Sequence, residues 1–107
     1  MLARPAQYLP ALAYKISKAA MNALTVQYAL DYEKEGFTFM ALCPGWMKTD
    51  LSGGEMADVT AEEGAKASLD LIWRPGQDPN GKFPKVFVKG WEKAEGHNQY
   101  DGSIPPW

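Results

Sequence analysis

Residues 37–45 read FTFMALCPG, and the fold class of the chain can be inferred from them. Its first seven residues are almost all apolar, and Pro44 and Gly45 follow at once. A continuous apolar run of this length is typical of a strand that is buried on both faces of a parallel sheet. We therefore predict a strand over residues 37–43 that ends at Pro44.

A helix is predicted before this strand. Residues 11–35 are rich in helix-forming residues, contain no Gly or Pro, and have apolar side chains at helical spacing. The polar residues at the end of this segment are followed by Gly36, and glycine is the residue type that most often ends a helix. The sequence therefore predicts one long helix over residues 11–35.

A second helix and a second strand are predicted further along the chain. Residues 46–57, WMKTDLSGGEMA, are interpreted as a loop. Thr60 and Glu63 then have the spacing of a capping box, which favours a helix over residues 61–74. A strand is predicted over residues 84–89. The inward face of the second helix is predicted to carry four apolar residues, namely Ala65, Leu69, Ile72 and Trp73.

The predicted order is helix, strand, helix, strand, so the fold class is α/β. The last three elements form one βαβ unit, whose crossover is right-handed in nearly all proteins. A two-stranded parallel sheet is not stable by itself, and the strand over residues 37–43 keeps one open edge. We therefore expect the chain to form part of a larger sheet.

The bulk properties exclude several classes of function. The formal net charge is −2, the sequence pI is about 5.3 and there is no basic run, so neither nucleic acid nor a membrane surface is an expected partner. No segment reaches the ~20 apolar residues that span a bilayer. Cys43, the single cysteine, is interpreted as a small buried strand residue and cannot form an internal disulfide. This fits a reducing compartment, so a cytoplasmic location is expected, and no metal site is predicted.

Tyr14 and Lys18 place a phenol and an ammonium group four residues apart, on one face of the first predicted helix. A phenol has an unperturbed pKa of about 10, and a nearby positive charge lowers the pKa of a phenol. Such a pair suits proton transfer to or from a carbonyl or alcohol oxygen. A solvated lysine beside a half-buried tyrosine has the same spacing, and the spacing alone does not separate the two interpretations.

The context of this pair resembles the short-chain dehydrogenase/reductase family. In that family, a helix with a Tyr-x-x-x-Lys motif precedes a strand that ends in Pro-Gly, and a Thr follows four residues after the Gly. The corresponding residues here are Tyr14, Lys18, Pro44, Gly45 and Thr49. Two linked motifs in the right order make the resemblance specific.

The resemblance covers roughly residues 11–90, with residues 1–10 as an irregular lead-in and residues 91–107 as a loop-like tail. The tail resembles a fungal carbonyl-reductase-like branch of the family. The implied fold is the C-terminal portion of a Rossmann-like doubly wound parallel sheet, without the N-terminal dinucleotide-binding half. The implied reaction is hydride transfer between NAD(P) and a small carbonyl or alcohol substrate.

The resemblance also implies a role for each matching residue. Tyr14 would be the general acid in carbonyl reduction and the general base in alcohol oxidation, with NADP favoured over NAD as cofactor. Lys18 would hydrogen-bond the ribose hydroxyls of the nicotinamide nucleotide. Pro44 and Gly45 would let the backbone approach the nicotinamide, and Thr49 would contact its carboxamide or the phosphates.

The loop and the first helix have further implied roles. Residues 46–57 would belong to a mobile substrate-binding loop, in which Trp46 and Met47 either line the substrate pocket or only pack the loop. The helix over residues 14–35 would take part in homo- or hetero-oligomers. An alternative function is therefore a non-catalytic interaction module that docks on a full-length relative through this helix.

Two parts of the family pattern are missing from the sequence. No Gly-x-x-x-Gly-x-Gly turn is present to cradle a pyrophosphate. The family places a substrate-polarising Ser about 12 or 13 residues before the Tyr, and these positions hold Met1 and Leu2. We therefore expect a fragment of a complete reductase, which by itself neither binds nor oxidises NADPH appreciably.

Overall fold

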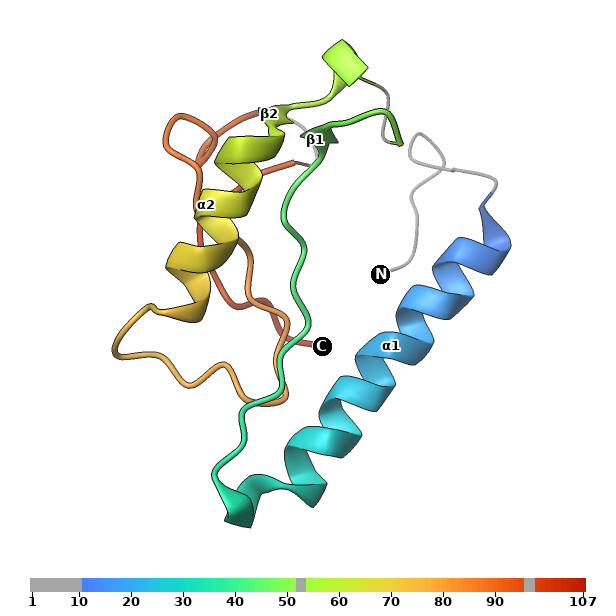
Figure 1. Ribbon diagram of the computed structural model, residues 1–107, viewed down its shortest axis with the longest axis vertical. Helices are drawn as coiled ribbons and strands as arrows, with labels where there is room; N and C mark the ends of the chain where they lie inside the picture. The colour runs from blue at the N-terminus through green and yellow to red at the C-terminus, as the bar shows by residue number, and fades with distance from the viewer. Residues whose placement is uncertain (1–10, 52–53, 96–97) are drawn as a thin grey trace.

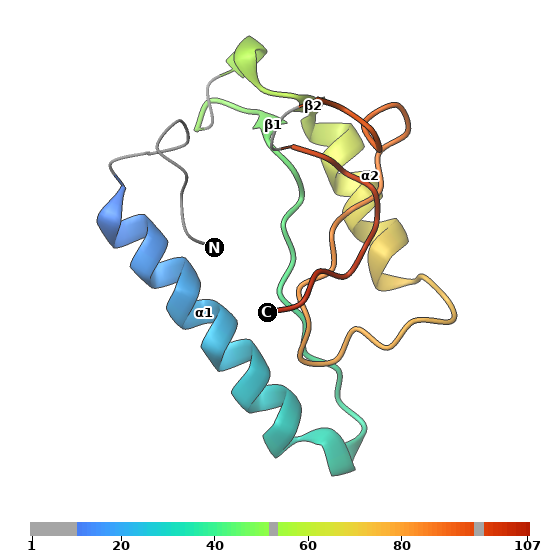
Figure 2. The ribbon, with the colours of Figure 1, turned by 180° about the vertical axis from the view of Figure 1, so that it is seen from behind.

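The computed structural model describes residues 11–51, 54–95 and 98–107. Figure 1 shows α1 along one side of the molecule and α2 on the other, with the extended chain that leads to β1 running between them. Figure 2 shows the same arrangement from behind. Within the described residues, the elements in chain order are α1 (Leu12–Asp31), η2 (Glu33–Glu35), β1 (Met47–Lys48), η3 (Gly54–Met56), β2 (Val59–Thr60) and α2 (Ala61–Ile72).

The helix predicted over residues 11–35 is confirmed as α1, although its last residues take a different form. The amide of Tyr32 donates to Tyr28 O at 3.1 Å, and the chain then continues as the 3-10 turn η2. Gly36 follows with a φ of 77°, a left-handed conformation that a residue without a Cβ adopts at little cost. Gly36 therefore ends the helical segment, as predicted.

The α1 helix buries little of its apolar surface. Ala29 is the buried residue of α1, whereas Leu12, Ile16, Leu24 and Leu30 are between 49% and 73% exposed. Within the described part of the chain, no helix combines the length and the apolar character that crossing a membrane requires. Most of the apolar face of α1 is thus available to another surface.

The turn at Asn80 holds the C-terminal end of α1 against the rest of the molecule. The side-chain amide of Asn80 donates to Ala29 O at 3.3 Å, and its Oδ1 accepts from Phe39 N at 2.9 Å. The rings of Tyr28 and Phe39 also lie in contact, with centroids 5.4 Å apart. This end of α1 is therefore fixed by both polar and aromatic contacts.

The prediction of a continuous strand over residues 37–43 is wrong. The described backbone is extended there, but it pairs with residues 81–85 through isolated hydrogen bonds and one parallel bridge, between Cys43 and Lys85. Pro84 has no N–H to donate, which interrupts the pairing. Cys43 is exposed rather than buried, because the opposite edge of this segment has no neighbouring strand among the described residues.

The strand predicted over residues 84–89 is also reduced to isolated bridges, and part of its pairing is with the tail. Phe87 and Asp101 form an antiparallel bridge, and Gly102 N donates to Val86 O at 3.2 Å beside it. The tail was predicted to be loop-like. Its described residues form no helix or strand, and backbone hydrogen bonds tie them to the body of the molecule.

The predicted loop over residues 46–57 contains the start of the regular sheet. β1 and β2 pair in parallel, with Met47 opposite Val59 and Lys48 opposite Thr60. Strands of two residues are too short to show a periodic pattern in the sequence. The described residues thus form a small two-stranded parallel sheet with helices, an α/β arrangement that is consistent with part of a Rossmann-like fold.

The capping box predicted at the start of α2 is confirmed. Thr60 Oγ1 accepts from Glu63 N at 3.1 Å, and Glu63 Oε2 accepts from Thr60 N at 2.8 Å. The predicted inward face is wrong, because the buried residues of α2 are Gly64, Ala67 and Leu71. The four residues that were predicted to face inward are all exposed, namely Ala65, Leu69, Ile72 and Trp73.

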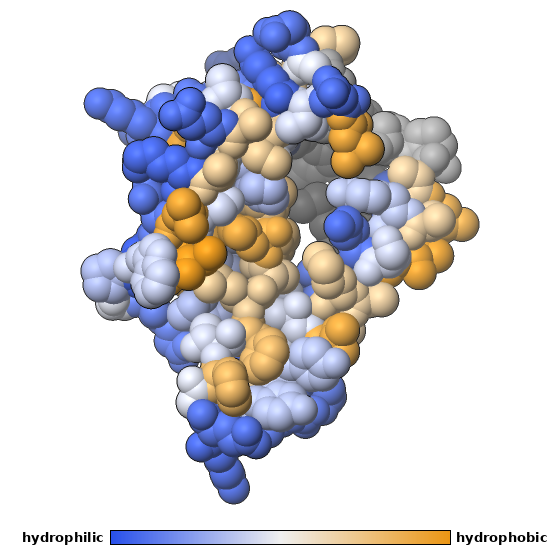
Figure 3. Space-filling view, viewed as in Figure 1, coloured by the Kyte–Doolittle hydropathy of each residue, from blue (hydrophilic) through white to orange (hydrophobic). Residues whose placement is uncertain are grey.

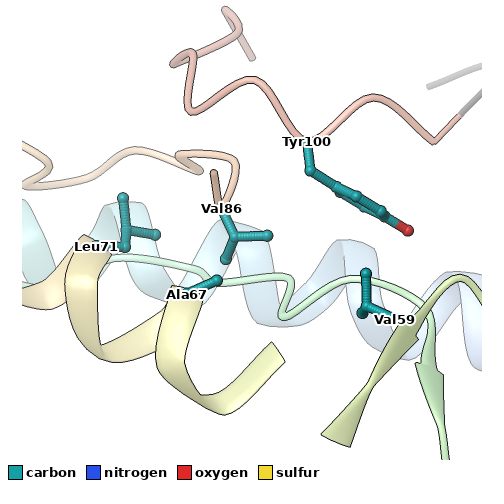
Figure 4. Packing of buried hydrophobic residues seen from close by; sticks show 5 residues of the cluster. All are labelled: Val59, Ala67, Leu71, Val86 and Tyr100. Atoms are coloured by element: carbon teal, nitrogen blue, oxygen red, sulfur yellow. The ribbon is translucent and has the colours of Figure 1, made fainter. Parts of the chain in front are cut away.

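The hydrophobic core lies between α2 and the C-terminal third of the chain. Val59, Ala67, Leu71, Val86 and Tyr100 form one buried cluster. Figure 4 shows the side chain of Val86 and the ring of Tyr100 facing the residues of β2 and α2. No described α1 residue belongs to this cluster. The sheet, α2 and the tail therefore form one packed unit.

Candidate functional site

Tyr14 and Lys18 lie one turn apart on α1, as their spacing predicted. Lys18 Nζ lies 5.4 Å from the centre of the Tyr14 ring, within the range of a cation–π contact. Tyr14 is 62% exposed and Lys18 is also exposed. The helix therefore fixes the spacing of the phenol and the ammonium group, and both groups are accessible to a ligand.

Pro44, Gly45 and Thr49 lie in a second group of predicted site residues, around β1. Gly45 has a φ of 90°, which an L side chain adopts only with strain. A Cβ on Gly45 would lie 3.4 Å from two ring carbons of Tyr100, so the ring packs directly on this backbone. Thr49 O accepts from Gly54 N at 3.2 Å, which closes the turn after β1.

The N-terminal end of α1 and the strand β1 lie toward the same end of the molecule, opposite to η2 (Figures 1 and 2). The structure thus places the two groups of predicted site residues at one end. The chemical roles of these residues stay predictions. Met1 and Leu2, which occupy the positions of the family's serine, lie outside the described residues.

Trp46 and Met47 differ in their surroundings. Trp46 is 40% exposed, whereas Met47 is partly buried and packs against the core cluster, which favours loop packing for Met47. A Cβ on Gly64 would lie 2.7 Å from Met47 Cγ and 3.0 Å from Pro44 O, so α2 approaches this loop closely. Gly64 was not predicted as a site residue. Its signal in the sequence is a glycine inside a helical pattern.

Tyr100 was not predicted as a functional residue either, yet it connects the loop to the tail. Its hydroxyl donates to Asp58 Oδ2 at 2.6 Å and accepts from Trp46 N at 3.0 Å. Burial of the ring, together with the hydrogen bond to Asp58, raises the pKa of Tyr100 to about 12. Tyr100 therefore keeps its proton, and its role as a hydrogen-bond donor, throughout the neutral range.

We expect the raised pKa of Tyr100 to make the free energy of unfolding fall between about pH 10 and about pH 12. An unfolded tyrosine ionises near pH 10, whereas the folded state resists ionisation until about pH 12. The contribution is fully present below the unfolded pKa and is lost as the pH rises through the folded pKa, a loss of about 2 kcal/mol. Urea unfolding across this range measures the loss. The Tyr100→Phe variant should lack it, and an unchanged pH dependence in that variant would contradict the assignment.

A cavity of about 360 Å³ is lined by other residues, namely Asp70, Arg74, Phe87, Asp101 and Gly102. Arg74 Nη1 donates to Gly102 O at 3.0 Å, so this arginine already binds the tail. None of the predicted site residues lines the cavity. The cavity is therefore separate from the group around Tyr14 and from the group around Gly45.

Curated relatives match about two thirds of the chain. C-signal of Myxococcus xanthus is 36% identical over 73 residues, which are 68% of this chain and 43% of that protein. Short-chain dehydrogenase/reductase 1 of Saponaria officinalis is 39% identical over 71 residues, which are 66% of this chain and 22% of that protein. The chain thus spans less than half the length of these relatives. No family model matches it.

A solved structure shares the fold. The NADPH-bound carbonyl reductase from chicken fatty liver superposes with a TM-score of 0.69 at 31% identity, over 96% of this chain and 36% of that chain. These proteins come from a bacterium, a plant and an animal, so the fungal branch stays a prediction. Over about two thirds of its length the chain is related in sequence to proteins that include a short-chain dehydrogenase/reductase, and its fold is that of part of a carbonyl reductase.

Proposed function

We propose that this chain provides the proton-transfer part of an NAD(P)-dependent short-chain dehydrogenase/reductase that reduces a small carbonyl compound or oxidises an alcohol. The observation that carries the proposal is the pair formed by Tyr14 and Lys18, whose functional groups lie together on α1 and are exposed. The similarity to a short-chain dehydrogenase/reductase and to an NADPH-bound carbonyl reductase supports it. A single cysteine fits a reducing, cytoplasmic setting.

Tyr14 and Lys18 would divide proton transfer and cofactor binding between them. The Tyr14 hydroxyl would donate a proton to the carbonyl oxygen during reduction and accept one from the alcohol during oxidation. The Lys18 ammonium would donate hydrogen bonds to the ribose hydroxyls of the cofactor. A bound nicotinamide dinucleotide supplies or accepts the hydride.

The described residues fit the nicotinamide end of such a cofactor. Gly45 has a φ of 90° and no side chain, the ring of Tyr100 covers the side that a Cβ would occupy, and Thr49 lies directly after β1. The sequence contains no Gly-x-x-x-Gly-x-Gly turn for the pyrophosphate. NADP is favoured over NAD because the solved structure with the same fold is an NADPH complex. We propose that a complete site needs a pyrophosphate cradle from outside these residues.

Binding and turnover by the purified chain test this proposal. We expect no change in NADPH fluorescence on adding the chain, and no loss of NADPH absorbance with a reactive aldehyde, because positioning of the cofactor supplies several kcal/mol of catalysis. Consumption of NADPH that depends on Tyr14 would show that the chain is a complete catalyst. It would therefore contradict the need for a separate cradle.

A hybrid reductase tests the catalytic half of the proposal. In this hybrid, residues 11–107 replace the matching segment of the chicken carbonyl reductase, which shares the fold at 31% identity. The rest of that protein then supplies cofactor-binding residues. We expect the hybrid reductase to oxidise NADPH with a carbonyl substrate.

A second candidate function is a non-catalytic docking module. One observation favours it, since the apolar residues of α1 are largely exposed and Ala29 is its buried residue. Figure 3 shows apolar side chains on this face of the molecule, on the α1 side as well as over the α2 side. In this case α1 would dock on a full-length relative to form mixed oligomers. Size-exclusion chromatography after co-expression should then show one mixed species, and separate elution of the two proteins would contradict docking.

A further inference from the structure

The hydroxyl of Tyr100 joins both ends of the loop from Trp46 to Asp58, which contains Thr49 and directly follows Pro44 and Gly45. It accepts from Trp46 N at 3.0 Å, at the start of the loop, and donates to Asp58 Oδ2 at 2.6 Å, at its end. Trp46 O also accepts from Asp58 N at 3.0 Å, so the two ends already meet through the backbone. One oxygen atom on the tail therefore closes the base of this loop.

The tail holds Tyr100 firmly in place. Tyr100 is 8% exposed and belongs to the core cluster, and its ring packs on Trp91 with centroids 5.6 Å apart. Its backbone is fixed on both sides, since Tyr100 N donates to Trp91 O at 3.2 Å and Tyr100 O accepts from Val88 N at 3.1 Å. A side chain held this rigidly can set the position of a loop that contacts it.

The contacts of the ring and of Asp58 extend this arrangement. A Cβ on Gly45 would lie 3.4 Å from two carbons of the Tyr100 ring, so the ring also supports the predicted nicotinamide-binding backbone. Asn98 Nδ2 donates to Asp58 Oδ2 at 2.8 Å, which holds the carboxylate that accepts the hydrogen bond of the Tyr100 hydroxyl. Two tail residues thus converge on one loop carboxylate.

We propose that Tyr100 is a positioning residue, which acts through Trp46 and Asp58 to hold residues 44–49 in the geometry that cofactor binding requires. The role in cofactor binding rests on the proposed function, whereas the hydrogen bonds of Tyr100 are independent of it. It makes the tail, which the family motifs do not include, part of the site. It also makes loop order depend on one phenol hydroxyl.

Amide hydrogen exchange in the full chain tests whether Tyr100 orders the loop, without any cofactor. Replacing Tyr100 with Phe keeps the ring but removes the acceptor of the Trp46 N–H and the donor to Asp58. We expect exchange at the Trp46 amide to become about 10-fold to 100-fold faster, as for a partly buried hydrogen bond that loses its acceptor. Amide exchange in α2 should change less than about twofold, because Ala67 and Leu71, the core residues of that helix, keep their packing.

Three further variants show whether the effect belongs to this hydrogen bond. Tyr32→Phe is the matched control, because Tyr32 lies in the aromatic contacts beside η2 and should leave the Trp46 amide unchanged. Asp58→Ala removes the acceptor of the Tyr100 hydroxyl and should speed exchange at the Trp46 amide. Asp58→Asn keeps an acceptor and should preserve most of the protection of that amide. Unchanged exchange at Trp46 in Tyr100→Phe, or equally faster exchange throughout α2, would overturn the proposal.

The hybrid reductase separates this inference from the proposed function. There, Tyr100→Phe should raise KM for NADPH about 10-fold while kcat changes less than about threefold, because a displaced loop weakens cofactor binding more than proton transfer. A fall in kcat with an unchanged KM would overturn the positioning role. Absence of any turnover in the unaltered hybrid would instead count against the proposed function, while the exchange at Trp46 still decides whether Tyr100 orders the loop.

Discussion

Replacing Tyr14 with Phe in the hybrid reductase is expected to lower kcat about 10²-fold to 10⁴-fold. The substitution removes the hydroxyl that transfers the proton, and general acid–base catalysis contributes this much to a reaction rate. Tyr14 is 62% exposed and lies outside the core cluster, so the fold should persist. KM for NADPH should change little, because Lys18 keeps its ammonium group. Steady-state NADPH oxidation at saturating carbonyl substrate measures the effect.

Tyr28→Phe is the matched control for this prediction. Tyr28 is on the same helix, is 41% exposed and contacts the ring of Phe39 through its own ring, which Phe preserves. The rate of this control should stay within about twofold of the unaltered hybrid, as expected for a surface substitution. If Tyr14→Phe and Tyr28→Phe retained equal activity, Tyr14 would not be the proton donor.

Replacing Leu71 with Ala is expected to lower the free energy of unfolding of the chain by about 2–5 kcal/mol. Leu71 is 4% exposed and lies in the core cluster with Ala67 and Val86, so truncation leaves a cavity as well as removing apolar contacts. Urea unfolding monitored by tryptophan fluorescence measures the change. A loss of this size would show that packing between α2 and the core cluster stabilises the chain.

Two leucines outside the core are controls for Leu71. Leu69 is on the same helix and is 56% exposed, and Leu24 is on α1 and is 49% exposed. Substitution of either by Ala should cost less than about 1 kcal/mol, because much of each side chain already contacts water. A larger loss at Leu24 than at Leu71 would show that the core lies under α1 instead.

Local signals in the sequence predicted both helices. The α1 segment depends on helix-forming residues and on Gly36, and the start of α2 depends on the hydrogen bonds between Thr60 and Glu63. These determinants lie within a few residues of the elements that they define. The spacing of Tyr14 and Lys18 is local in the same sense, so the contact between them could also be predicted.

The buried face of α2 and the pairing of residues 37–43 depend on long-range packing, so the sequence did not predict them. Two stripes of small and apolar residues have helical spacing on α2, and the buried one begins at Gly64, where the helix must approach Met47 and Pro44. The extended segment over residues 37–43 is apolar, but a strand also needs a continuous pairing partner. Neither the close approach nor the partner can be recognised from neighbouring residues.

The contacts of Tyr100 show the same limit within the candidate site. Its hydroxyl binds Asp58, 42 positions earlier in the chain, and Trp46, 54 positions earlier. No short motif connects residues at these separations. A tyrosine near the end of the chain therefore gave no indication in the sequence that it would close the base of the loop.

We infer that Tyr14 and Lys18 form a working catalytic pair. The most direct measurement is NADPH oxidation by the hybrid reductase, under conditions in which NADPH binding is confirmed by fluorescence. We expect carbonyl-dependent oxidation at a rate at least 10²-fold above that of the Tyr14→Phe hybrid, as general acid–base catalysis requires. A hybrid that binds NADPH but oxidises it no faster than the Tyr14→Phe hybrid would contradict the claim.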